Sequence, residues 1–286
     1  MMLRRCLLVG GVAMITVLWA SASVRADDKP RRIVSLNLCT DQILLELVPR
    51  NRIAALSWLA GDGNVSAVAG ELKGIKLIAG GAEEVLALDP DLVLASPYAA
   101  TPAVELLKRL GQRVEMVPFA TDFAMIRSTV RQVAAAVGEI VRGEDVIARF
   151  DRALEAAQSK AAQHPEALVY QVNGLVSGTG SLADAALKAA GLANQMDRRS
   201  AATGTRLALE SIVVMPPDLV VLAQGMHTYR TVVSDNLRHP ALARIMTKTA
   251  GMELPMPLWL CGSPRISDAV GMLAATRDRL PASKIP

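Results

Sequence analysis

The chain has 286 residues, of which 51% are hydrophobic, 3% aromatic and 20% charged. This length and apolar content suit a globular protein with two medium-sized cores. The net charge of +4 arises mostly from arginines among the first 26 residues, because the remaining 260 residues hold 28 basic and 27 acidic side chains without a basic stripe. A near-neutral chain argues against a nucleic acid or an anionic membrane surface as the partner.

Residues 1–26 have the pattern of a secretory signal peptide. A basic start precedes an apolar run over residues 7–20, which is shorter than a usual membrane span. Val24 and Ala26 are small residues at the positions that a signal peptidase reads, so we expect cleavage to leave Asp27 first. An uncleaved membrane anchor is the alternative. Cleavage would place the mature protein in the periplasm, an oxidising compartment.

Strands and helices are expected to alternate in the first half of the chain. The expected strands cover residues 31–36, 52–58, 91–95 and 113–119. The expected helices cover residues 41–48, 83–88, 102–110 and 125–137. Thr40 or Asp41 is expected to cap the first of these helices after a loop over residues 37–40. Residues 61–74 are polar and rich in glycine, which predicts a surface loop.

A long helix is expected over residues 143–163, followed by the stop signal His164-Pro165. The stretch has no proline and no glycine after position 143, and alanine is abundant. Apolar residues recur along it at spacings of four and three, which predicts one buried stripe: Val146, Phe150, Leu154 and Ala157. At 1.5 Å per residue this helix would span about 30 Å, the width of a small domain.

The second half repeats the order of the first. The expected strands cover residues 167–172, 218–222 and 253–260. The expected helices cover residues 181–190, 210–214, 241–249 and 263–280. Ser181 and Ser263 are expected to cap their helices, and Gly251 to close the third.

An internal repeat relates the two halves. Residues 83–96 (EEVLALDPDLVLAS) align without a gap with residues 210–223 (ESIVVMPPDLVVLA) at an offset of 127. The sequence therefore predicts an α/β fold of two Rossmann-like lobes with mostly parallel sheets, joined by a long connector helix. The expected division is a signal peptide (1–26), an N-terminal lobe (27–124), connector helices (125–164) and a C-terminal lobe (165–286). Ligands of such sheets bind at the carboxyl ends of the strands, here in a cleft between the lobes.

The sequence gives little support for catalysis or for a metal site. The histidines stand apart from one another and from any nucleophile motif, so a histidine-rich metal site is not expected. The segment Gly178-Thr179-Gly180-Ser181 resembles a phosphate-binding loop. It is not a Walker motif, because no Gly-Lys-Ser/Thr follows it. One alternative hypothesis remains from this loop, namely a cleft enzyme that acts on a phosphorylated substrate.

The chain resembles the substrate-binding proteins of ABC importers for ferric siderophores and cobalamin, the class in which one long helix joins two lobes. The resemblance spans residues 31–280 and rests on the order of several segments: IVSLNLCTDQILLEL, EEVLALDPDLVLAS, GSLADAALKAAGL paired with ESIVVMPPDLVVLA, and CGSPRISDAVGML. It implies a monomeric periplasmic receptor, without catalysis or a resident cofactor, that delivers a ferric siderophore or a cobalamin-like ligand to a membrane permease. A receptor-like domain that signals without transport is a further alternative.

The resemblance also suggests residues that line the ligand cleft. Trp58 follows the second strand, where such receptors carry a ligand-contacting aromatic, and the other candidates are Tyr98, Trp259 and Arg265. Structural roles are open for all of them: Trp259 in the core, Arg265 on nearby carbonyls, and Tyr98 as a surface ring. Leu77 and Gly204 replace aromatic residues of well-known cobalamin receptors, which argues against cobalamin, whereas the segment 263–265 (SPR) resembles the cobalamin branch.

Two further pairs of residues have one member in each lobe, and the members of the first pair match in the repeat. Glu83 and Glu210 begin the short helix of each repeat, where glutamates of this family form salt bridges with arginines of the two permease subunits. A carboxylate in a first helical turn also interacts favourably with the helix dipole. Cys39 follows the first strand and Cys261 the last, so we expect both near the cleft or the hinge. A disulfide bond between them and two buried free thiols are both compatible with that placement.

Overall fold

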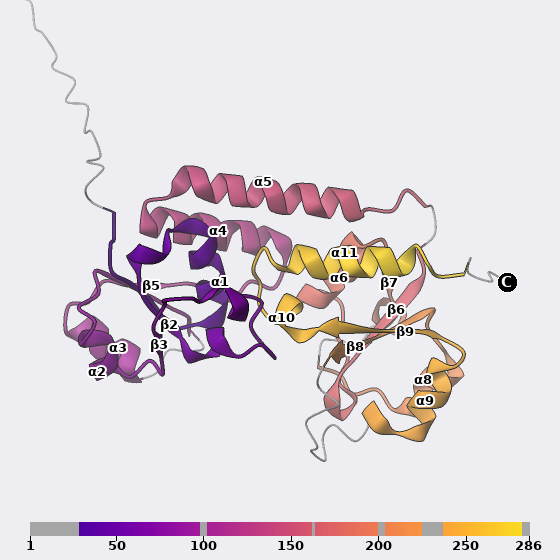
Figure 1. The fold of residues 1–286 in the computed structure, drawn as a ribbon. Coiled ribbons are helices and arrows are strands. Elements are labelled where there is room, and N and C mark those ends of the chain that lie inside the picture. The colour runs from indigo at the N-terminus through magenta and orange to yellow at the C-terminus, as the bar shows by residue number, and fades with distance from the viewer. Residues whose placement is uncertain (1–28, 98–101, 162–163, 200–203, 225–236, 282–286) are drawn as a thin grey trace, which may run out of the picture.

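The computed structural model describes residues 29–97, 102–161, 164–199, 204–224 and 237–281. It contains two sheets of parallel strands, one in each lobe, with helices packed on both faces of each sheet (Figure 1). The α/β class with two lobes and parallel sheets is therefore confirmed.

The N-terminal sheet has the strand order β3-β2-β1-β4-β5. Its strands are β1 (Ile33–Ser35), β2 (Ile53–Ser57), β3 (Leu77–Ile78), β4 (Leu92–Ala95) and β5 (Val114–Met116). Successive side chains point to opposite faces. Ile33 and Leu92 therefore pack against the face covered by α1 (Leu38–Leu47) and α4 (Phe123–Val137). Val34 and Val93 pack against the other face, covered by α2 (Ala82–Leu86) and α3 (Pro102–Arg109).

The C-terminal sheet has the strand order β7-β6-β8-β9. Its strands are β6 (Glu166–Tyr170), β7 (Ala193–Asn194), β8 (Leu219–Gln224) and β9 (Ala250–Pro255). One face packs on α6 (Leu182–Ala189) and α11 (Ile266–Arg277). The other packs on α7 (Gln195–Arg198), α8 (Leu209–Val214) and α9 (Pro240–Met246), whereas the short helix α10 (Met256–Trp259) leads from β9 toward α11.

The connector is the helix α5 (Ile140–Ala157), which runs along the top of both lobes in Figure 1. The predicted apolar stripe is confirmed, because Val146, Phe150, Leu154 and Ala157 are all buried. The predicted bounds are wrong: the helix begins before Gly143 and ends at Ala157. Gly143 lies inside it because a Cβ there would come within 2.6 Å of the Ala134 Cβ, so glycine permits the close packing of α5 on α4.

Three other predictions about helix and strand ends are wrong. The first helix begins at Leu38, because the Asn37 side chain accepts a hydrogen bond from the Cys39 amide and acts as its cap in place of Thr40 or Asp41. Gly251 lies within β9 and does not close α9. The last helix begins at Ile266, without a capping Ser263.

The repeated aspartates of the two PDLV segments have the same role in both lobes. Asp91 accepts hydrogen bonds from the backbone amides of Arg31 and Arg32, just before β1. Asp218 accepts one from the amide of Glu166, at the start of β6. Each carboxylate thus satisfies amides at the start of the neighbouring strand, which gives a physical reason for the repeated motif.

Candidate functional site

The carboxyl edges of the two sheets face each other. Cys39, just beyond the carboxyl end of β1, forms a disulfide bond with Cys261, which follows the carboxyl end of β9, and their Cα atoms are 5.2 Å apart. Gly262 lies so close to Ala120, beyond β5, that a Cβ on it would clash with the Ala120 carbonyl oxygen. Loops that follow the strands of one lobe therefore meet loops of the other, at the edges where parallel sheets bind ligands.

The disulfide belongs to a longer contact between the lobes, which we call the staple and define as residues 261–265 with α1. The Ser263 hydroxyl lies 2.6 Å from Gln42 Oε1, and Arg265 forms an ion pair with Glu46 at 3.2 Å. The three α1 residues in contact, at positions 39, 42 and 46, lie on one face of the helix. The segment therefore follows α1 from its first turn to its last.

Trp58 is an exposed aromatic residue at this edge of the N-terminal lobe. It directly follows β2 and is 57% exposed. Its ring is free to cover a ligand face, because it is not part of the hydrophobic core.

A buried carboxyl group contacts Ser57, the residue that precedes Trp58. Asp41, in the first turns of α1, is fully buried and accepts a hydrogen bond of 2.5 Å from the Ser57 hydroxyl. Burial raises the pKa of Asp41 to about 7, although hydrogen bonds from Ser35 and Ser57 act in the opposite direction. This bond fixes the end of β2 to α1 and so supports the position of Trp58. Sequence reasoning treated Asp41 only as a possible helix cap, because an isolated aspartate near a helix start is typical of a cap.

On the C-terminal lobe, Arg206 lies at the corresponding edge. Residues 172–176 continue from β6, and Leu175 pairs there with Arg206 in an isolated antiparallel bridge. Arg206 is exposed and is 2.5 Å from the side-chain oxygen of Asn173 when the amide is oriented to accept. Among the described residues it has no carboxylate partner. Sequence reasoning missed Arg206, since nothing in the local pattern marks it.

Two of the other predicted ligand residues, Trp259 and Arg265, lie within the described part of the chain. Tyr98 lies outside the described residues. Trp259 lies in α10, where an apolar strand was expected, and packs against the hydrophobic core. Arg265 is held by Glu46 and also by Glu71 at 2.9 Å, near the C-terminal end of α1 and thus toward the amino edge of the sheet. These two ion pairs favour the structural role that the sequence left open for Arg265, and ligand contact by this side chain stays a prediction.

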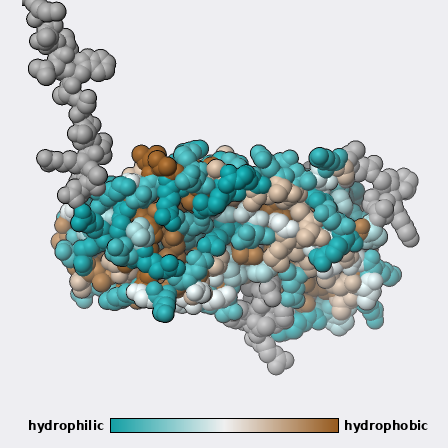
Figure 2. Space-filling view, turned by 45° about the horizontal axis from the view of Figure 1, so that its top comes forward, coloured by the Kyte–Doolittle hydropathy of each residue, from teal (hydrophilic) through white to brown (hydrophobic). Residues whose placement is uncertain are grey.

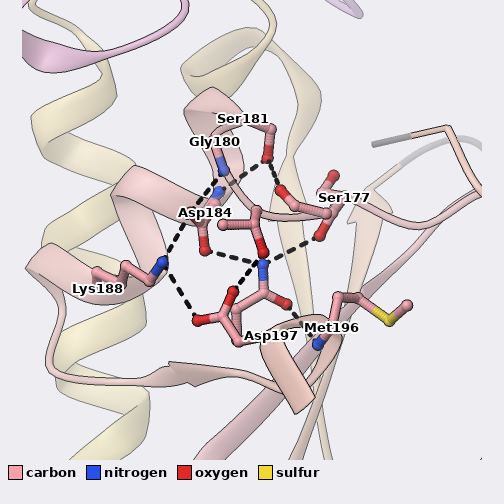
Figure 3. Close-up of polar contacts among 10 residues, drawn as sticks. Ser177, Gly180, Ser181, Asp184, Lys188, Met196 and Asp197 are labelled. Atoms are coloured by element: carbon pink, nitrogen blue, oxygen red, sulfur yellow. Dashed lines mark hydrogen bonds and ion pairs between the residues drawn. The ribbon is translucent and has the colours of Figure 1, made fainter. Parts of the chain in front are cut away.

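The loop that suggested a phosphate site is occupied by the protein's own carboxylate (Figure 3). The Gly180 amide donates to Asp184 at 2.9 Å, and the Ser181 hydroxyl donates to the Gly178 carbonyl. Burial opposes ionisation of Asp184, but hydrogen bonds from Gly180, Lys188 and Asn194 outweigh it and hold its pKa below the usual range. A phosphate here would meet this negative charge, so the loop does not favour the alternative of a phosphate-binding enzyme.

Glu83 and Glu210 are both exposed and lie in the first turns of α2 and α8. The neighbouring Glu84 differs, because its carboxylate accepts hydrogen bonds from the amides of Ala79 and Gly80. Among the glutamates of α2 and α8, Glu83 and Glu210 are therefore the two that are available to pair with a cation of another protein.

The described residues show neither a metal-binding cluster nor a membrane-spanning helix. They contain no cluster of three or more histidine, cysteine, aspartate or glutamate side chains suited to a metal ion. Within the same ranges, no helix is both long and apolar enough to cross a membrane.

Comparison with known proteins identifies relatives by sequence. A family model described as "Periplasmic binding protein" matches residues 33–250. A cobalamin-binding protein of Halobacterium salinarum is 26% identical over 210 residues, which cover 71% of this chain. The match covers 56% of that relative, so the chain spans little more than half the length of the curated relatives it matches.

Solved structures share the fold at low sequence identity. The haem-binding protein RhuT from Roseiflexus has a TM-score of 0.71 at 22% identity, covering 86% of this chain and 97% of that one. For the haem-binding protein HutB of Vibrio cholerae the TM-score is 0.72 at 17% identity, with 86% and 98% covered. The vitamin B12-binding protein BtuF of the same organism gives 0.64 at 15%, with 87% and 97% covered. At these identities the likeness shows the fold alone.

Proposed function

The chain belongs to the periplasmic binding protein family, and from that premise we propose that it is the receptor of an ABC importer. In this proposal residues 1–26 direct secretion, the mature protein works in the periplasm, and its ligand is a bulky metal chelate of the siderophore or tetrapyrrole class. The ligand is bound between the lobes and carried to an inner-membrane permease. The receptor supplies binding and delivery, and the proposal contains no catalytic step.

The observation that carries the proposal is the exposed ring of Trp58 at the carboxyl edge of a parallel sheet that faces a second such sheet. A large flat or aromatic chelate can stack on an indole, and stacking of this kind adds about 0.5–1.5 kcal/mol beyond the buried area. Arg206 on the opposite lobe supplies a cation for an anionic group of the ligand, such as a carboxylate. The family match and the cobalamin-binding relative support the same ligand class.

Ligand binding can be tested with the protein's own fluorescence. The mature chain of residues 27–286 retains only Trp58 and Trp259 of the three tryptophans. We expect titration with haem, cobalamins or ferric siderophores to quench emission, and Trp58→Phe to remove most of the quenched signal while preserving binding measured by absorbance. Trp259→Phe is the matched control. An absence of saturable binding by all three classes would contradict the proposed ligand class.

Docking on the permease is proposed to use Glu83 and Glu210. A two-fold permease offers two equivalent sites, and the internal repeat places one exposed carboxylate on each lobe to meet them. Rim charges of this kind mainly affect orientation and association rate. We therefore expect Glu83→Ala/Glu210→Ala to retain ligand affinity but lose uptake, with a partial loss for each single change. Normal uptake by the double variant at wild-type expression would leave the two carboxylates only a helix-dipole role.

The alternative of a signalling receptor shares the fold and the cleft. It predicts ligand binding without transport, so deletion of the gene would abolish a ligand response but leave uptake of the labelled chelate unchanged.

A further inference from the structure

A cavity of about 770 Å³ lies at the amino ends of β8 and β9, on the side of the C-terminal sheet away from the cleft. It opens between α8 and α9, and Leu280 forms part of its boundary. Most of its lining is apolar: Ile212, Val213, Pro216, Pro217, Ala241 and Ile245. The cavity is separate from the proposed ligand site, which lies at the opposite edge of the same sheet.

The internal repeat does not by itself produce this apolar cavity, because the N-terminal lobe is built differently at the equivalent place. Arg32 there donates hydrogen bonds through its guanidinium to the carbonyls of Leu88 and Asp89, at the end of α2. The equivalent position, at the start of β6, is Glu166, which pairs with Arg198 at 2.8 Å. The strand registers establish the equivalence, since β1 pairs with β4 as β6 pairs with β8.

Two cations border the cavity without partners. Arg244 and Lys248 lie four residues apart, at and just beyond the end of α9, and both are exposed. Among the described residues, neither side chain has an ion pair or a hydrogen bond. Asp218 also borders the cavity, but one of its oxygens accepts the Glu166 amide. The three side chains together carry a net positive charge, which favours a partner with carboxylates.

The outer wall of the cavity continues into an exposed apolar surface. Val213 is 58% exposed and Val214 is 83% exposed. They lie three and four residues after Glu210, so the three side chains share one face of α8. A small molecule inside the cavity would leave Val214 in water, whereas a protein surface laid against α8 would cover it. Exposed apolar residues beside a concave site are typical of protein interfaces.

We propose that the α8–α9 cavity receives an apolar side chain of a protein segment whose neighbouring carboxylates pair with Arg244 and Lys248. The inference rests on the proposed receptor function, since Glu210 on the same helix face identifies the partner as the permease. Docking would then be unequal on the two lobes: the N-terminal lobe offers a carboxylate, and the C-terminal lobe offers a carboxylate, an apolar cavity and two cations.

Site-specific photocrosslinking of the full chain tests this inference in cells that carry the permease required for uptake. A photoreactive residue replaces Val214, its repeat counterpart Ala87, or Glu83, and cross-linked products are identified by antibody to the permease. We expect all three positions to cross-link to the permease. Arg244→Glu/Lys248→Glu should lower cross-linking from position 214 about tenfold, without changing ligand affinity.

The matched control is Lys73→Glu/Lys76→Glu, which makes the same change of charge at exposed positions of the N-terminal lobe. This control should leave cross-linking from position 214 unchanged. Cross-linking from positions 83 and 87 but not from 214 would overturn the inference and leave the receptor function intact. No cross-link from any position, together with unchanged uptake on deletion of the gene, would overturn both. Cross-linking of position 214 to lipid, with sedimentation on phosphatidylglycerol vesicles, would assign the cavity to a membrane surface instead.

Discussion

Removal of the Cys39–Cys261 disulfide bond is the most direct test of how the lobes are held together. The bond joins residues 222 positions apart. In the chain-entropy model, a cross-link over a loop of this length stabilises the folded state by about 5 kcal/mol, through restriction of the unfolded chain. This value is the largest loss of unfolding free energy that we expect for Cys39→Ser/Cys261→Ser. The core that α4, α5 and α11 share is unchanged by the substitution and still holds the two lobes together.

Equilibrium unfolding in urea, followed by tryptophan fluorescence, measures this loss. We expect the double variant to unfold at a clearly lower urea concentration than the oxidised wild type. Wild type treated with dithiothreitol is the control and should match the variant, since both lack the bond. The rest of the staple should also loosen, which hydrogen exchange would detect as faster exchange at α1 and at residues 261–265.

Two results would refute the reasoning. Titration of two free thiols in the denatured, unreduced protein would show that the bond is absent from the purified protein. Equal unfolding midpoints for the oxidised wild type and the double variant would show that the α4–α5–α11 core alone decides the stability of the lobe arrangement.

The remaining predictions concern the cleft and the staple. Trp58→Ala should weaken chelate binding yet leave the melting temperature nearly unchanged, whereas a loss of about 3–5 kcal/mol would assign the ring to the core. Burial raises the pKa of Asp41 to about 7, above the unfolded value, so its contribution to stability is present at low pH and is lost as pH rises through 7. Asp41→Asn should therefore gain stability relative to wild type between pH 5 and pH 8, and a constant difference in urea midpoints would contradict this. Gly262→Ala should destabilise the protein because its Cβ would meet the Ala120 carbonyl, whereas Gly63→Ala, with open space around it, should not; equal thermal melts would refute the close approach.

Periodic and repeated features of the sequence were sufficient to predict the architecture. The apolar stripe of α5 and the two PDLV segments are local patterns, so they can be recognised without knowledge of distant contacts. Helix and strand ends were predicted less well. The sequence predicted helix boundaries at Gly143 and Gly251, yet Gly143 lies inside α5 and Gly251 inside β9. Both glycines are close to side chains of neighbouring elements, and such contacts cannot be recognised from the local sequence.

The candidate site was also predictable only in part. The sequence by itself determined the α/β lobes, the connector, the matching positions of Glu83 and Glu210, and the place of Trp58 after a strand. Only the tertiary structure decided that Arg265 pairs with Glu46 and Glu71, that Asp41 is buried, and that a cavity opens beside α8. The physical reason is that burial, ion pairing and cavity shape depend on segments far apart in the chain, such as α1 and the staple, whose contacts leave no periodic mark in the sequence.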